Sequence, residues 1–228
     1  MTEKQTFKHE LLKQLGFDIS KAKEAYNFIM EESDNTLEGA IVNTDTSDVS
    51  DGVYLQYADG FCVRFTGENP ESEVDNCIGI AIKCGSRSIC VALSDEAAGE
   101  EITLTCRKDK TKYDRYITEC IDAVADWNGK ENTEHLKEIG LNSEIHLEGG
   151  WWIPSVAELY LIFTNLKTIN EALEYVGGTP IEQDWYWSST ENSATNAWIL
   201  HFSYGYLNYG GTKATGSGHV RAVSASTL

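Results

Sequence analysis

The feature that most constrains the fold of this chain is a change in hydrophobic period at residue 53. From there apolar residues recur at every second position, as in a half-buried strand, in the runs VYLQYADGFCVRF and CIGIAIKCGSRSICVAL. Each run contains a turn signal, Asp59-Gly60 in the first and Gly85-Ser86 in the second, and this is typical of a β-hairpin. Strands joined in hairpins are antiparallel, so the sequence predicts an α+β fold and not a doubly wound parallel sheet. A further short strand is expected at EITLTC, residues 101–106.

Helical spacing of apolar residues marks the remaining segments. It covers residues 3–33, which predicts a helical N-terminal segment over 1–50, either as a separate appendage or packed on the main domain, and it recurs over 113–127 and 132–140. After Pro154, Ser155 and Glu158 form the capping-box signature S-x-x-E at the start of an apolar stripe. Thr168 and Glu171 repeat this signature for a second helix, which Gly177 is expected to end.

The C-terminal strip from Tyr186 to Val223 differs in composition from the rest of the chain. Between Asn192 and Leu228 there is no acidic residue and only two basic ones, Lys213 and Arg221, although the protein has a formal net charge of −18. Ser, Asn and Gly turns separate four runs that predict strands, WYWSST, AWILHFS, GYLNYG and HVRAVSA. Tyr, Ser, Gly and Asn are also the residues that antibody-type binding loops favour. The strip is therefore either a glycine-rich β-meander or a contact surface.

Alternation along these strands divides the strip into two faces. The inward face is expected to hold Trp187, Trp198, Leu200, Phe202, Val220 and Val223. The outward face supplies the candidate ligand-binding residues, which are Ile199, His201, Tyr204, Tyr206, Asn208, Tyr209, Gly210, Thr212, Thr215, Ser217 and His219. The lack of acidic residues favours a contact role, because no carboxylate would have to be desolvated at the centre of an interface.

Charge and composition exclude several classes of partner. Residues 151–228 hold six acidic and three basic residues, a net charge of −3, which leaves −15 for the first 150. This charge repels phosphate backbones and anionic lipids, so we expect no nucleic-acid partner and no membrane insertion. The N-terminal residues carry scattered charges and no apolar stretch of signal-peptide length, so we expect synthesis in the cytoplasm without a signal peptide.

The sequence also argues against a cofactor or a metal. All six cysteines lie between Cys62 and Cys120, with no CxxC pair and no histidine at zinc spacing. We expect buried, reduced thiols, no cofactor and no metal site.

Several motifs together resemble a known family. The order WWIPSVAELYLIFTNL, YWSSTE, NYGGTK and VRAV over about residues 150–225 is similar to the variable proteins that diversity-generating retroelements diversify in phages and bacteria. The resemblance implies a C-type lectin fold of the formylglycine-generating-enzyme type. We expect short mixed or antiparallel strands and two helices in a ligand-binding domain at 51–228, with a variable region at about 185–223.

In that family a reverse transcriptase randomises adenines of a template repeat, so that Asn codons of the AAY type come to encode many residues. These include Tyr, His, Asn, Ser, Thr, Gly, Ala and Ile but never Trp, Met, Lys, Glu or Gln. The candidate binding residues all fall in the permitted set. The expected scaffold residues Trp187, Glu191, Trp198 and Lys213 fall outside it, whereas Arg221 does not.

The resemblance implies binding without chemistry, with a host-surface protein or glycan as ligand and a homo-oligomer as an open option. We expect a receptor-binding protein of a phage or prophage, associated with the tail of the virion; a bacterial surface adhesin and a metal-independent carbohydrate-binding lectin are the alternatives. The formylglycine-generating oxidases of the same fold use cysteines in the C-terminal part of the domain, and this chain has none after Cys120. A calcium lectin would need carboxylates that the strip from 192 lacks.

Overall fold

The computed structural model describes residues 49–69, 74–106 and 115–228. The chain divides into two units, with the boundary between Ser50 and Asp51. The helices predicted for 1–50 lie almost wholly outside the described residues. All described helices and strands belong to the second unit, Asp51–Leu228.

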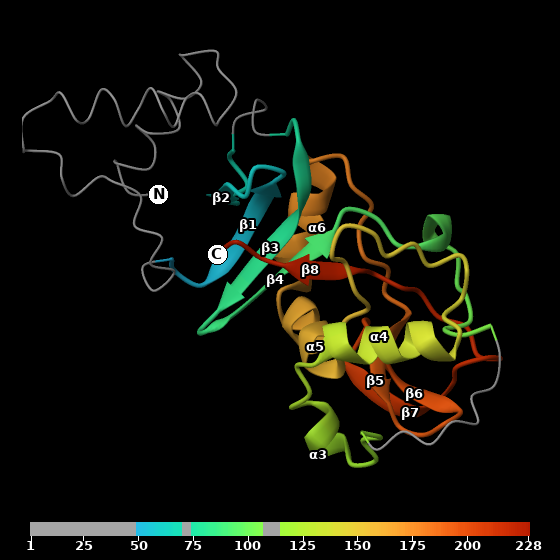
Figure 1. Ribbon diagram of the computed structural model, residues 1–228. Helices are drawn as coiled ribbons and strands as arrows, with labels where there is room; N and C mark the ends of the chain where they lie inside the picture. Colours follow the sequence, from blue (N-terminus) through green and yellow to red (C-terminus); the bar gives the residue numbers. More distant parts are fainter. Residues whose placement is uncertain (1–48, 70–73, 107–114) are drawn as a thin grey trace, which may run out of the picture. The chain divides into compact units, whose positions relative to one another are not determined.

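A five-stranded antiparallel sheet forms one side of this unit (Figure 1). Its strands, in the spatial order β2-β1-β3-β4-β8, are β2 (Cys62–Arg64), β1 (Gly52–Tyr57), β3 (Cys77–Cys84), β4 (Arg87–Ala92) and β8 (Val223–Ala225). Both predicted hairpins are confirmed, because β1 pairs with β2 and β3 pairs with β4. Gly60 and Gly85 sit in the two turns at φ +82° and +56°, a left-handed conformation that glycine adopts without strain.

A second antiparallel sheet contains the C-terminal strip. Its strands are β5 (Trp185–Glu191), β6 (Asn196–His201) and β7 (Tyr206–Thr212), in the order β5-β6-β7. Three of the four predicted strands therefore form this sheet, and the fourth run supplies β8 of the other sheet. Between the pairs Ile199↔Asn208 and Ala197↔Gly211 the register shifts, so that two residues of β7, Tyr209 and Gly210, stand opposite Trp198. This is a β-bulge.

Three longer helices pack on the sheets (Figure 1). Helices α5 (Val156–Thr164) and α6 (Leu166–Tyr175) contact β3 of the first sheet, and α4 (Gly129–Ile139) contacts β5 of the second. The predicted capping box is confirmed, because the Ser155 hydroxyl accepts from the Glu158 N–H and the Glu158 carboxylate accepts from the Ser155 N–H. The described part of the chain is thus α+β with antiparallel sheets, as predicted.

The structure corrects five predictions. The described part of 113–127 contains only the one-turn helix α3 (Cys120–Ala123), and EITLTC forms isolated bridges and no strand. Thr168 caps no helix, because α6 begins two residues earlier, directly after α5. With α3 and the 3₁₀ turn η4 (Ala97–Gly99), the described residues hold more helices than the two expected. Only Cys90 of the six free thiols is fully buried.

Apolar cores cover both faces of the second sheet. The paired residues Tyr186 and Leu200 point into the core shared with the first sheet, α5 and α6. Trp187, which pairs with Ile199, points the other way into a smaller core that includes Leu104 and Leu136. All six residues predicted to face inward are buried. The prediction that they form a single face was wrong, because Trp187 and Leu200 lie on opposite faces of one sheet.

Candidate ligand-binding face

A buried polar framework holds the second sheet in place. The motif YWSSTE forms β5, and Tyr186 donates a hydrogen bond to Asp95 at 2.9 Å. Asp95 also accepts at 2.5 Å from Arg221 of the motif VRAV, whose guanidinium donates further to the carbonyls of Ala92 and Thr179. Burial, with Asp95 adjacent, raises the pKa of the Tyr186 hydroxyl far above its usual range. A buried ion pair of this kind is stable only when its hydrogen bonds are satisfied, and here they are.

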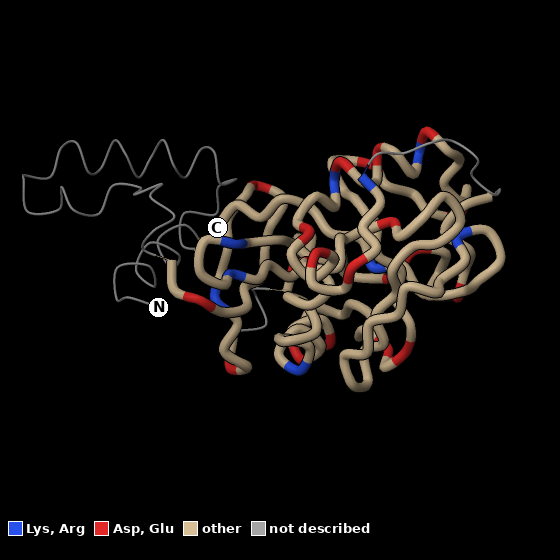
Figure 2. Tube along the Cα trace, turned by 90° about the horizontal axis from the view of Figure 1, so that it is seen from below, with Lys and Arg blue, Asp and Glu red and all other residues tan. Residues whose placement is uncertain are grey.

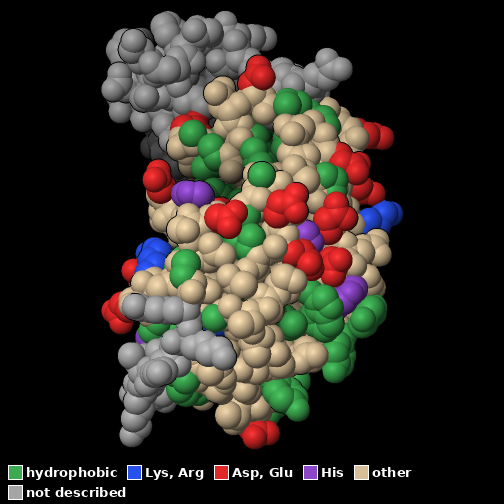
Figure 3. Space-filling model, turned by 90° about the vertical axis from the view of Figure 1, so that its right-hand side faces the viewer, with side chains coloured by type: hydrophobic (Ala, Val, Ile, Leu, Met, Phe, Trp, Pro, Cys, Tyr) green, Lys and Arg blue, Asp and Glu red, His purple; other side chains and the backbone are tan. Residues whose placement is uncertain are grey.

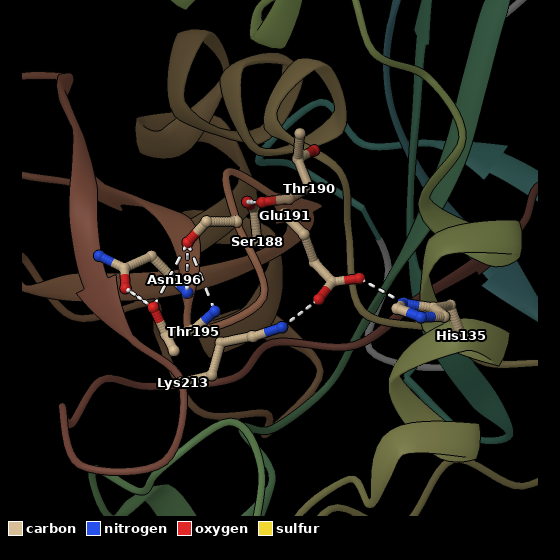
Figure 4. Close-up of polar contacts among 8 residues, drawn as sticks. His135, Ser188, Thr190, Glu191, Thr195, Asn196 and Lys213 are labelled. Atoms are coloured by element: carbon tan, nitrogen blue, oxygen red, sulfur yellow. Dashed lines mark hydrogen bonds and ion pairs between the residues drawn. The ribbon is translucent and has the colours of Figure 1, made fainter. Parts of the chain in front are cut away.

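A second buried ion pair fixes the far end of β5 (Figure 4). The Glu191 carboxylate accepts from Lys213, which follows β7, and contacts Nδ1 of His135 on α4 at 2.5 Å. The side chains of Glu191 and Lys213 are at most 1% exposed. One carboxylate thus connects β5, the segment after β7 and α4. The neighbouring Thr190 donates to Asp126 at 2.7 Å and accepts from the backbone N–H of Val156.

An exposed cluster of aromatic rings lies at the other end of the sheet. The ring centroids of Trp185 and His201 are 4.8 Å apart, those of Trp185 and Tyr206 5.9 Å apart, and His201 stacks on Tyr204 at 4.5 Å. Tyr204 and Tyr206 are 65% and 52% exposed. We call Trp185, His201, Tyr204 and Tyr206 the aromatic patch. It offers ring faces and two phenol hydroxyls without a formal charge of its own when His201 is neutral.

The turn that presents this patch depends on one glycine. Gly205 joins β6 to β7 at φ +69°, and its carbonyl accepts a hydrogen bond from the Tyr160 hydroxyl at 3.0 Å. A Cβ at this position would lie 2.7 Å from the ring of Phe163 on α5. Tyr204 and Tyr206 are therefore held by a turn that packs against a helix of the core.

Tyr209 is exposed but does not belong to the aromatic patch. It is 64% exposed, and its ring packs edge-on against Trp198 at 5.9 Å. The bulge in β7 causes this, because Tyr209 and Gly210 together face Trp198. Trp198 and Tyr206 occupy opposite faces of the sheet by alternation, so the prediction of one face for all three tyrosines was wrong.

The other predicted residues occupy varied surroundings. Ile199, Asn208 and His201 are partly buried, and Gly210, Thr212, Thr215 and Ser217 are exposed. The Asn208 side chain accepts from the Gly210 N–H at 2.6 Å, which tightens the bulge, and Thr215 donates to Thr212. Ser217 donates to Glu101, a residue outside the strip.

His219 is the predicted outward residue that the structure places inside. It is only 8% exposed, and its ring lies against that of Tyr186 with centroids 5.1 Å apart. After β7 the chain leaves the β7 edge of the sheet. The backbone of His219 instead bonds to Trp185 and Trp187 of β5, so alternation within β7 could not predict its orientation.

Sequence reasoning missed Trp185 as a member of the site. The run WYWSST was assigned to a strand, and the first tryptophan was given no role. Its signal was alternation, since Trp185 and Trp187 share one face of β5 and Trp187 fills the core beneath that face. Trp185 pairs with His201 near the end of the sheet, where that core no longer covers it.

The surface of the molecule is mixed in character on the side that Figure 3 shows. Figure 3 shows one face of the molecule, on which acidic side chains and histidines gather above an area of polar and hydrophobic side chains. Along the chain trace, Asp and Glu positions are spread among fewer Lys and Arg positions (Figure 2). Within the described residues, no helix combines the length and apolar character needed to cross a bilayer.

Comparison with known proteins yields a fold and no family. No family model matches the chain, and a search of curated proteins found no match. A crystal structure of a fimbrial protein from Bacteroides ovatus ATCC 8483 is similar, with a TM-score of 0.53 and 20% sequence identity. The similarity covers 77% of this chain and 48% of the fimbrial protein, so this chain matches about half of that protein's length. At this identity the likeness is one of fold alone.

Proposed function

We propose that this chain is a non-enzymatic binding protein that contacts an external partner through the aromatic patch. The observation that carries the proposal is the exposure of Tyr204 and Tyr206 beside Trp185 and His201, on a turn fixed against α5. Aromatic residues give large and rigid contact area at small entropic cost, and they dominate the energetics of many interfaces. Asn208, two residues after Tyr206 on the same face of β7, adds a polar side chain beside them.

The division between fixed and exposed residues supports diversification of the binding residues by a retroelement, on the C-type lectin fold that we propose from the resemblance. The expected scaffold residues Trp187, Glu191, Trp198, Lys213 and Arg221 are all buried. Ten of the eleven candidate binding residues are at least partly exposed, and His219 is the exception. A protein whose contact residues change while its fold persists needs this division, because substitutions at exposed positions usually cost little stability.

Two settings suit such a protein. The first is a phage or prophage virion, where the chain would bind a host-surface protein or glycan from the tail tip. The second is the bacterial surface, where it would act as an adhesin. The fold shared with a fimbrial protein favours the second setting.

The retroelement part of the proposal is tested at the DNA level. We expect the locus to contain a second, near-identical copy of the codons for residues 185–223, with differences at adenines, and a reverse-transcriptase gene nearby. A locus with neither feature would rule out diversification of this gene, but it would leave the binding proposal standing.

The binding part is tested with a glycan array and with purified host-surface proteins as separate probes. We expect one of the two probe classes to bind the full chain, and we expect Tyr206→Ala to reduce that binding at least about tenfold. Binding to neither class, or binding that Tyr206→Ala leaves unchanged, would refute the proposed role of the aromatic patch.

A further inference from the structure

Three potential metal ligands from distant parts of the sequence meet beside the aromatic patch. They are Glu101, Asp184 and His219, and one ligand atom of each lies within 4.8 Å of those of the other two. Glu101 follows η4, Asp184 immediately precedes β5, and His219 lies between β7 and β8. The arrangement therefore exists only in the folded chain.

Backbone hydrogen bonds fix the three segments next to one another. Ile102 and Gly218 bond reciprocally, with N···O distances of 3.0 and 3.2 Å, which ties the neighbour of Glu101 to the neighbour of His219. The His219 N–H donates to the carbonyl of Trp185, the residue after Asp184, at 2.8 Å. The segment of His219 is thus hydrogen-bonded to the segment of Glu101 and to the segment of Asp184.

The His219 side chain lacks the partner that a buried imidazole needs. Its Nδ1 has no hydrogen-bond partner. Among the buried side-chain nitrogen and oxygen atoms of the described residues, it is the one atom in this state. The residue is 8% exposed, and its ring is held against Tyr186. An unsatisfied buried polar group destabilises the fold, and such a group in a native fold calls for an explanation such as an ion.

Each of the two carboxylates also has an oxygen that can bind a metal ion. Glu101 accepts from the Ser217 hydroxyl at 3.2 Å, and Asp184 accepts from the Trp185 N–H at 2.7 Å, each through one oxygen. Within the described residues, no Lys or Arg forms an ion pair with either carboxylate, and Nε2 of His201 lies 4.0 Å from Oδ1 of Asp184. Two carboxylates and an imidazole therefore converge without a Lys or Arg to balance them.

We propose that Glu101, Asp184 and His219 bind a divalent transition-metal ion of the Zn²⁺ class. Imidazole with carboxylate ligands suits Zn²⁺ and its neighbours, whereas Ca²⁺ prefers six to eight oxygen ligands. Metal–ligand bonds of about 2.0–2.2 Å require the ligand atoms to draw closer than they stand here, and the exposed carboxylate side chains can turn inward to do so. Three protein ligands leave a fourth position of a tetrahedral site open, and Asp184 directly precedes Trp185 of the aromatic patch.

Sequence reasoning expected no metal because the cysteines form no CxxC pair and have no histidine at zinc spacing, and because the strip from residue 192 has no carboxylate for calcium. The fold supplies both carboxylates from outside the strip, from Glu101 and Asp184, and adds the histidine that was expected to face outward. The inference does not depend on the proposed binding function, because a metal at this site would tie together three chain segments whether or not a partner binds.

Calorimetric titration of the full, metal-free chain with Co²⁺ and with Zn²⁺ tests the site, and the absorption spectrum of the Co²⁺ form identifies the ligands. The spectrum is needed because Cys84, Cys106 and Cys120 are exposed and thiolates also bind these metals. We expect one equivalent of Co²⁺ to bind without a thiolate-to-cobalt charge-transfer band. Glu101→Gln and Asp184→Asn, which preserve size, should each weaken binding at least about tenfold.

Glu100→Gln and Glu182→Gln are the matched controls, since they remove the same charge from exposed residues close by in the sequence. We expect each to change the affinity less than about twofold, because an exposed charge outside the coordination sphere acts only through a screened field. No binding to the wild-type chain, a thiolate band, or equal effects of the ligand and control variants would each overturn the proposal. Circular dichroism of every variant checks that the fold is retained.

Discussion

At the scale of single residues, the fold depends on charged side chains that are buried with their partners. Glu158 is the clearest case, at 4% exposure. Its carboxylate closes the capping box of α5 and accepts from the indole N–H of Trp152 at 3.2 Å. Burial raises the pKa of this carboxyl to about 7, and hydrogen bonds from Ser155 and Trp152 oppose the rise without cancelling it.

This pKa predicts a dependence of stability on pH. A carboxyl whose pKa is higher in the folded state binds its proton more tightly there, so it stabilises the fold below about pH 4.5, and that contribution is lost as the pH rises through 7. The loss amounts to about 3 kcal/mol. Glu158→Gln cannot titrate, so the free energy of unfolding of the wild type should fall relative to that of Glu158→Gln between pH 4.5 and 8.

Urea denaturation of both proteins at several pH values measures the difference. Glu174→Gln, at an exposed position on α6, is the control, and its difference from the wild type should vary much less over this range. A wild-type stability that stays level with, or rises against, that of Glu158→Gln would contradict the assigned pKa.

At the scale of elements, local signals predicted well and long-range pairing did not. The β1–β2 and β3–β4 hairpins and the start of α5 follow from turn and cap residues that act within a few positions. Residues 115–119 fail as a helix because Ile117 bonds to Glu191 and Trp198, more than seventy positions away. The prediction that Thr168 begins the second helix was also wrong, because Asn165 ends α5 and begins α6 directly after it.

The candidate site shows the same division. Exposure of Tyr204, Tyr206 and Tyr209 was predictable from composition and alternation. The β7 bulge, which separates Tyr209 from the other two, falls at Tyr209-Gly210, just before Gly211, and glycine inside a strand is a bulge signal that the prediction of one outward face did not use. The burial of His219 comes from its backbone pairing with β5, and periodicity within one strand carries no information about that pairing.

The β6–β7 turn gives a prediction that compares two glycines. Gly205 and Gly177 both have positive φ, +69° and +75°, but only Gly205 has an atom near its missing Cβ. Gly177→Ala should lower the free energy of unfolding by about 1 kcal/mol through backbone strain alone. Gly205→Ala adds a clash with Phe163 and should cost about 3 kcal/mol.

Thermal or urea unfolding of the two variants at one pH is sufficient for the comparison. Because the backbone strain is common to both, the difference between them reports the packing of the turn on α5. If the two variants lose the same free energy of unfolding, the turn can move away from Phe163 without cost. It would then not hold Tyr204 and Tyr206 in a fixed geometry.

At the scale of the whole molecule, the protein is strongly acidic, but most of its C-terminal strip has no acidic residue. The protein has a formal net charge of −18, and none of the residues after Glu191 is acidic. The structure places the rings of Tyr204 and Tyr206 on one side of the second sheet and Tyr209 on the other. Negative charge elsewhere disfavours nonspecific contact with anionic surfaces. The rings of the patch carry no carboxylate and can be desolvated at low cost, although the carboxylates of Asp184 and Glu101 lie beside them.

Exposed tyrosines lie on both sides of the sheet, so substituting those of each side in turn shows which side is the contact surface. The dissociation constant is measured by biolayer interferometry for the glycan or host-surface protein that binds the wild-type chain. If the aromatic patch is the contact surface, the double variant Tyr204→Ala with Tyr206→Ala should weaken binding about a hundredfold or more. Tyr209→Ala, which removes a 64% exposed ring beside Trp198, should weaken it less than about threefold. A double variant that binds as tightly as the wild type, or a larger loss from Tyr209→Ala, would contradict the assignment of the patch.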